Sequence, residues 1–121
     1  MNVVSEADAR TTRTAAAAMF GLAAPSQGST ELCTWRVEMA SGNATPVHEI
    51  DREQVWMPLS GGFEVTIGDE TETVKAGQAV IVPGGATRQL TALEDTQAIV
   101  AMPAGGQAVT PDGKVTPPWA A

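Results

Sequence analysis

The sequence predicts an all-β domain in which short antiparallel strands form a sandwich or a barrel. Apolar and polar residues alternate with a period of two from Glu31 onward, as half-buried strands require. Turn residues interrupt this pattern at close intervals, and the chain holds 12 Gly and 8 Pro. A length of 121 residues suits a single domain with its own core.

The first thirty residues are expected to form an N-terminal arm and a first edge strand. Residues 1–13 are polar and rich in threonine, which is typical of a loosely held arm. The run from Ala15 to Ala18 has the best helix propensity in the chain, although Gly21 and Pro25 would keep a helix short. The mixed charge before this run argues against a secretory signal peptide.

Residues 31–105 are expected to form the body of the barrel. The stretch "ELCTWRVEMA" places Cys33, Trp35, Val37 and Met39 on one face of a strand. Six strand-like runs follow, separated by short turns: "VHEI", "QVWMPL", "FEVTI", "ETVKAGQAVIVP", "RQLTAL" and "QAIVAMPA". Residues 106–121 are rich in proline, so we expect an extended tail that lies across the barrel and is anchored by Trp119.

Charge and cysteine content exclude several classes of protein. The net charge of -7 argues against nucleic acid as a partner, because seven Lys and Arg scattered along the chain build no basic patch. No apolar run reaches the length of a membrane-spanning helix, so we expect no membrane partner. The single cysteine, Cys33, allows no internal disulfide, which fits a cytoplasmic protein, and it is expected to be a small buried hydrophobe.

Two stretches resemble the two motifs of the cupin superfamily. The first is "HEIDREQVWMPLSG" and the second is "GQAVIVPGGATR", and the resemblance covers roughly residues 35 to 103. The turn residues that match the motifs are Gly42, Gly61, Gly77, Pro83 and Gly85. The resemblance implies a small single-domain cupin with a cupin-type antiparallel β-barrel, also called a jelly roll.

The metal-ligand positions of the two motifs are largely replaced. Typical cupins place three His and one Glu there and bind iron, manganese, nickel, zinc or copper, whereas this chain has His48, Ile50, Gln54 and Arg88. Isoleucine has no lone pair to donate, and arginine stays protonated and repels a cation. We therefore expect no metal cofactor. The alternative is a weakly bound divalent transition metal on His48 and Gln54, assisted by Glu49 or Asp51.

The same positions indicate a pocket for a small, possibly anionic molecule. His48 could move a proton, Arg88 could donate two hydrogen bonds to a carboxylate or enolate oxygen, and Gln54 could fix the His48 tautomer or hold a substrate oxygen. Alternatively, His48 is a core histidine bonded to Gln54, and Arg88 is a rim residue paired with Glu53 or Glu94. The apolar pocket walls are expected from Ile50, Trp35, Trp56, Met39 and Met102.

Three functions are compatible with such a pocket. The first is metal-independent acid/base chemistry of the isomerase, lyase or cyclase type, on an apolar metabolite that bears a carbonyl or carboxylate. The second is ligand binding or sensing without catalysis, and the third is a metal-dependent cupin oxygenase. We also expect a homodimer that is formed through the N-terminal segment or the Trp119 tail.

Overall fold

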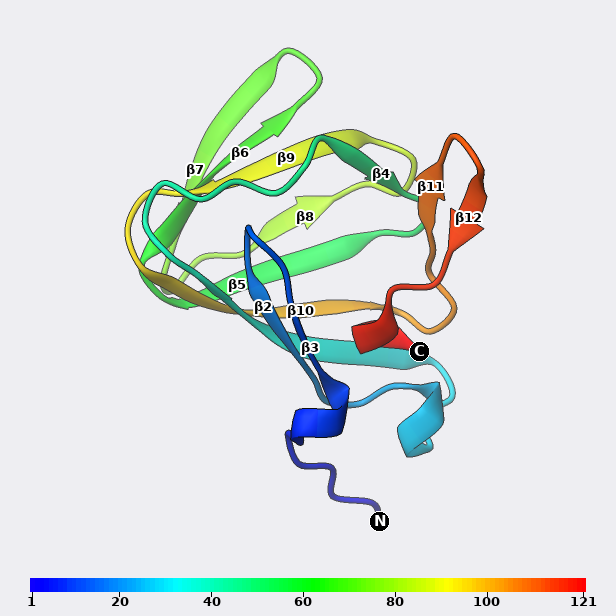
Figure 1. Ribbon diagram of the computed structural model, residues 1–121. Coiled ribbons are helices and arrows are strands. Elements are labelled where there is room, and N and C mark those ends of the chain that lie inside the picture. Colours follow the sequence, from blue (N-terminus) through cyan, green and yellow to red (C-terminus); the bar gives the residue numbers. More distant parts are fainter.

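Two six-stranded antiparallel sheets make up the structure, a computed structural model that describes residues 1–121 (Figure 1). The first sheet has the order β1 (Thr11–Arg13), β2 (Ala18–Gly21), β3 (Leu32–Met39), β10 (Thr96–Pro103), β5 (Gln54–Ser60) and β8 (Val80–Val82). The second sheet has the order β12 (Gly113–Val115), β11 (Ala108–Thr110), β4 (His48–Ile50), β9 (Thr87–Ala92), β6 (Gly62–Ile67) and β7 (Glu70–Lys75). The only helices are three short 3-10 turns, η1 (Asp8–Arg10), η2 (Pro25–Gln27) and η3 (Pro118–Ala120), and none is long or apolar enough to span a membrane.

The core lies between the two sheets, and the predicted all-β jelly roll is confirmed. The sheets remain separate and do not close into a continuous barrel. Strand β3 alternates as its sequence predicts, since Cys33, Trp35, Val37 and Met39 are buried and the residues between them are not. The second sheet contributes Phe63, Val65, Val74, Leu90 and Ala92 to the same core.

The N-terminal segment is tied to the first sheet. Its Ala-rich run forms no helix: Ala18 opens β2, and a turn through residues 14–17 joins β2 to β1. Pairing with the edge of β3 and burial of Met19 outweigh the high helix propensity of alanine. The residues before β1 are held as well, because Glu6 accepts two hydrogen bonds of 2.8 Å from Arg36. Residues 11–13 of the expected arm thus form an edge strand of the first sheet.

The C-terminal tail forms a hairpin instead of lying fully extended. Strands β11 and β12 extend the second sheet beyond β4, where the prolines at 111, 117 and 118 leave the hydrogen-bonding pattern intact. The chain then turns back to the first sheet, where η3 lies against β1, β2 and β3 (Figure 1). Ser26 holds the last residue there, since its Oγ donates to the Ala121 carbonyl at 2.6 Å.

Candidate functional site

A cavity of about 870 Å³ lies between the sheets, and its lining is mainly apolar. The first sheet contributes Met19, Trp35, Val37, Met39, Gln54 and Trp56. The second sheet and its hairpin contribute His48, Ile50, Ala108, Thr110 and Val115. Among all residues that line the cavity, His48 is the only one with an ionisable side chain.

Tryptophans dominate one wall of the cavity. Trp35 of β3 and Trp56 of β5 face Val100 of β10 from either side, so both indoles stand in one row on the inner face of the first sheet. Trp56 also meets Phe63 edge to face, with ring centroids 5.5 Å apart, which fixes its orientation. The third tryptophan, Trp119, reaches the same cavity from the C-terminal tail.

His48 presents one free ring nitrogen. Its Nδ1 lies 2.7 Å from the Pro46 carbonyl oxygen, which can only accept, so the neutral ring carries its proton on Nδ1. Nε2 is then an acceptor without a partner in the protein. Burial lowers the pKa of His48, and the nearby charge of Arg88 lowers it further, while the bond to Pro46 opposes both effects. The imidazole is therefore neutral at pH 7 and able to accept a proton.

Gln54 is fixed by three contacts and is only 3% exposed. Its Oε1 accepts hydrogen bonds from Trp56 Nε1 at 3.2 Å and from Arg88 Nη1 at 3.0 Å. These two donors define which end of the amide is oxygen. Nε2 donates one hydrogen to Met102 Sδ at 3.6 Å, and its second hydrogen has no acceptor in the protein. Gln54 thus offers an N–H donor to a molecule in the cavity.

Arg88 lies behind Gln54 and does not line the cavity. It is 1% exposed, and it donates from Nε to the Ala86 carbonyl at 2.8 Å and from Nη2 to the Pro83 carbonyl at 3.0 Å. No carboxylate forms an ion pair with it. Burial lowers the pKa of Arg88, an effect that the charge of Glu49 opposes. Arg88 supplies a fixed positive charge close to His48, its direct partner in the pairing of β4 with β9.

These contacts correct three details of the sequence-based interpretation. Arg88 is not a rim residue paired with Glu53 or Glu94, nor is it an open clamp for an anion, because its guanidinium is committed to Gln54 and to two carbonyls. The Pro46 carbonyl, and not Gln54, fixes the His48 tautomer. Met102 is buried behind Gln54 and does not line the cavity.

The other expected wall residues, Trp35, Met39, Ile50 and Trp56, do line the cavity. Sequence reasoning missed Met19 and Thr110, and it gave Trp119 only the role of a tail anchor. The alternation that identifies inward-facing residues in long strands is too short to read in β2 and β11, and it is absent from η3. Cys33 is fully buried, as expected.

The residues at the four metal-ligand positions do not fit a cation. The only oxygen among them belongs to Gln54, and it already accepts from Trp56 and from the positively charged Arg88. Asp51 cannot assist, because its carboxylate is bonded to Gln107 N at 2.7 Å and to Lys114 Nζ at 3.1 Å. Nowhere in the structure do three His, Cys, Asp or Glu side chains gather in a way that could hold a metal ion.

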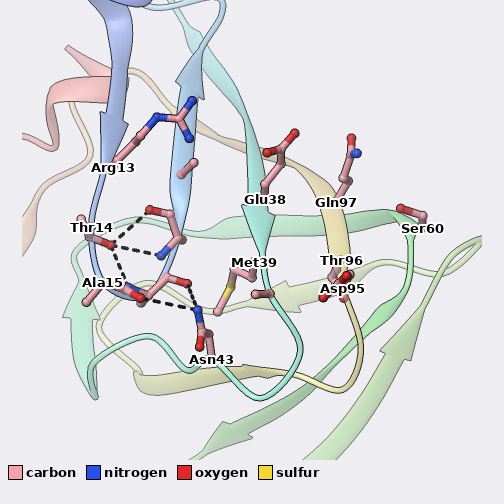
Figure 2. A pocket seen from close by; sticks show the side chains of 14 residues that line it. Arg13, Thr14, Ala15, Glu38, Met39, Asn43, Ser60, Asp95, Thr96 and Gln97 are labelled. Atoms are coloured by element: carbon pink, nitrogen blue, oxygen red, sulfur yellow. Dashed lines mark hydrogen bonds between the residues drawn. The ribbon is translucent and has the colours of Figure 1, made fainter.

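A second hollow of about 530 Å³ opens beside the cavity (Figure 2). It is more polar, with Arg13, Glu38, Asp95 and Gln97 among its lining residues. The turn through residues 14–17 lines both hollows and separates them. Only long hydrogen bonds of 3.4 Å, from Asn43 Nδ2 to the carbonyls of Ala15 and Ala16, attach this turn to the opposite loop.

Comparison with protein families gives a match to the cupin domain over residues 35–103. The chain belongs to the cupin family. Solved structures with the same fold include KdgF from Halomonas sp., with a TM-score of 0.67, 19% identity, and coverage of 81% of this cupin and 92% of that chain. The polyketide cyclase RemF from Streptomyces resistomycificus has a TM-score of 0.69, 20% identity and coverage of 85% and 75%.

A mutant of oxalate decarboxylase OxdC from Bacillus subtilis has the higher TM-score of 0.76 at 18% identity, and the match spans 86% of this cupin but only 30% of that chain. At these identities the structures share the fold, and the chemistry of each belongs to its own site. A search of curated proteins gives no match to this sequence.

Proposed function

We propose that this cupin transfers a proton, without a metal ion, on an apolar metabolite that carries a carbonyl or carboxylate group. The reaction would be of the isomerase, lyase or cyclase type. One observation carries the proposal: a single ionisable side chain, His48, lines an otherwise uncharged cavity and keeps Nε2 free in its neutral form. A neutral imidazole in a largely apolar pocket is a suitable general base at pH 7.

The proposed step begins with abstraction of a proton by His48. Nε2 takes a proton from the carbon next to the carbonyl, and the electron pair of that C–H bond forms the C=C bond of an enolate. His48 becomes an imidazolium, which then returns the proton to another atom of the substrate. In a lyase the enolate electron pair expels the group on the neighbouring carbon, and that leaving group takes the proton. In an isomerase a different carbon takes it. In a cyclase the enolate carbon bonds to a second carbonyl carbon of the same molecule, and the oxygen of that carbonyl takes the proton.

Gln54 and Arg88 favour the enolate electrostatically. The free N–H of Gln54 can donate to the carbonyl oxygen as negative charge develops there, and fixed donors of this kind are effective because they need no reorganisation. Arg88 polarises the same amide through Oε1. Arg88 is therefore a positioning residue in this mechanism, and it acts through Gln54 and its charge without touching the substrate.

Ligand binding without catalysis is the second candidate function. It is favoured by the absence of a second acid or base on the cavity wall, so that one imidazole would have to remove and return the proton. A metal-dependent oxygenase has less support, since the donor set does not fit a metal ion. A polyketide cyclase and an oxalate decarboxylase share this fold, which supports small-molecule chemistry only by analogy.

Deuterium exchange tests the proposal without knowledge of the natural substrate. A panel of ketones and 2-oxo acids is incubated with the protein in D₂O, and loss of the proton signal next to the carbonyl is followed by NMR. Exchange that wild type accelerates should fall by about a hundredfold or more in His48→Gln, a variant of similar size that lacks the base. Equal exchange in both proteins would refute the role of His48, and binding without exchange in either would favour the second function.

The cytoplasmic location and the homodimer remain predictions. We propose both on the sequence arguments given above, and light scattering of the purified protein tests the second directly.

A further inference from the structure

All three tryptophans of the chain line the same cavity, although they come from β3, β5 and the C-terminal tail. A chain with no tyrosine and two phenylalanines thus places its three largest side chains around one space. Burial of apolar area alone does not require this arrangement, because aliphatic residues could fill the same positions. Indoles provide wide, flat, rigid surfaces against which other rings stack.

The register of the first sheet sets these indoles in order. Gly21, Trp35, Val100 and Trp56 follow one another across β2, β3, β10 and β5. Gly21 begins the row with no side chain, and a Cβ there would lie 3.2 Å from the backbone oxygen of Trp119. The missing side chain therefore leaves room for the tail to cross the sheet, and this brings the third indole to the wall that already holds the other two.

The tail is fastened in this position from several sides. Ser26 donates to the Ala121 backbone oxygen twice, from Oγ at 2.6 Å and from its amide at 3.4 Å, and Ala120 is only 1% exposed. Trp119 is half-buried between these anchored residues. The indole thus belongs to a built wall, and the tail is an integral part of the cavity.

His48 and Gln54 present polar groups that can serve one end of a flat molecule. The other polar side chains of the lining each already form a hydrogen bond with a backbone group: Thr14, Asn43, Thr45, Gln89 and Thr110. His48 Nε2 accepts a hydrogen bond or a proton, and the free hydrogen on Gln54 Nε2 donates one. No carboxylate, lysine or arginine side chain lines the cavity to pair with a charged ligand or to bind several hydroxyls. Because these polar side chains are already engaged with the backbone, a sugar acid would find few free partners for its several hydroxyls, at a cost for each hydroxyl left unpaired.

We infer that the ligand is a planar aromatic or conjugated ketone with an enol or phenol group, and that its ring stacks on the wall formed by Trp35, Trp56 and Trp119. This inference rests on the proposed function for the roles of His48 and Gln54, and it adds the class of substrate. Trp119 is then a residue that determines specificity.

A matched pair of ligands tests the inference by calorimetry. 2′-Hydroxyacetophenone and 2-acetylcyclohexanone have the same number of carbon and oxygen atoms and the same conjugated keto–enol or keto–phenol unit, but only the first has an aromatic ring. The aromatic ligand should bind about tenfold more tightly, because one stacked pair contributes roughly that factor. Glucuronate serves as the polar, anionic comparison and should bind least.

Variants of two aromatic side chains locate the effect. Trp119→Leu should weaken binding of the aromatic ligand by about threefold to tenfold and leave the saturated ligand within about twofold. Trp119→Phe should retain most of the preference, and it also keeps the test valid if the leucine variant folds poorly. Phe20→Leu is the control, because Phe20 packs between the guanidinium groups of Arg13 and Arg36 and does not line the cavity.

Three results would overturn the inference: equal affinity for the two matched ligands, tighter binding of glucuronate, or no saturable binding of the aromatic ligand up to its solubility limit. The proposed function fails separately. If His48→Gln loses deuterium exchange but keeps the preference for the aromatic ligand, both the proposed function and the ligand class are supported. If exchange is unchanged and the preference is kept, only the proton transfer by His48 is refuted.

Discussion

Gln54→Leu should lower the free energy of unfolding by about 4 kcal/mol, even though leucine is close to glutamine in size. The substitution removes the acceptor that Trp56 Nε1 and Arg88 Nη1 share at 3.2 and 3.0 Å. Each buried donor left without an acceptor costs about 1–3 kcal/mol, and the charged guanidinium lies at the upper end of that range. About 1.5 kcal/mol for the indole and about 2.5 kcal/mol for the guanidinium give this total.

Urea denaturation at pH 7 measures this loss, and Gln54→Glu is the matched control. Glutamate keeps an oxygen for both donors and forms an ion pair with Arg88, so its stability should stay within about 1 kcal/mol of wild type. The glutamate variant should nevertheless lose the deuterium exchange, because it has no N–H for the carbonyl oxygen. A loss below about 1 kcal/mol in Gln54→Leu, or equal losses in the two variants, would refute the reasoning.

Three further predictions concern the histidine, a turn and metal content. The NMR signal of His48, the only histidine, should titrate below the ordinary pKa of 6.5, and its pKa should rise in Arg88→Met. A lowered pKa means that His48 binds its proton more tightly in the unfolded chain than in the folded protein. The contribution of His48 to the free energy of unfolding should therefore be fully present above pH 6.5 and should be lost as the pH falls through the folded-state pKa. A His48 titration above pH 6.5 would contradict this prediction. Gly61→Ala should lower the free energy of unfolding by about 1–3 kcal/mol more than Gly68→Ala, as measured by urea denaturation. Both glycines have positive φ (75° and 58°), but only a Cβ at Gly61 would collide, 2.5 Å from the Asp95 carbonyl oxygen. Equal losses in the two variants would contradict the predicted collision. Elemental analysis of protein purified without chelator should find no stoichiometric iron, manganese, nickel, zinc or copper, and a near-stoichiometric amount of any of them would contradict our interpretation of the donor set.

Local patterns were sufficient to predict the fold. The alternation in β3 identifies its buried face, and the glycines and Pro83 of the two motifs indicate a cupin. Both signals are encoded in neighbouring residues, because a strand has a period of two and a tight turn needs particular backbone angles. The same motifs brought His48, Gln54 and Arg88 to one end of the sheets.

The roles of these residues depended on tertiary contacts. Sequence placed Arg88 near the site, but only the carbonyls of Pro83 and Ala86 show that its charge is fixed behind Gln54 and cannot reach a ligand. The Pro46 carbonyl that sets the His48 tautomer is a backbone group, and a pattern of side-chain types does not show where a backbone group points.

The short elements at the two ends of the chain were likewise decided in three dimensions. Ala18 belongs to a strand because the edge of β3 is available to it, against its own propensity. Trp119 lines the cavity because Gly21, far away in the sequence, leaves space for the tail. The two motifs are therefore enough to identify a cupin without the usual metal ligands. Which groups face the cavity depends on tertiary contacts, because these join segments that no local pattern connects.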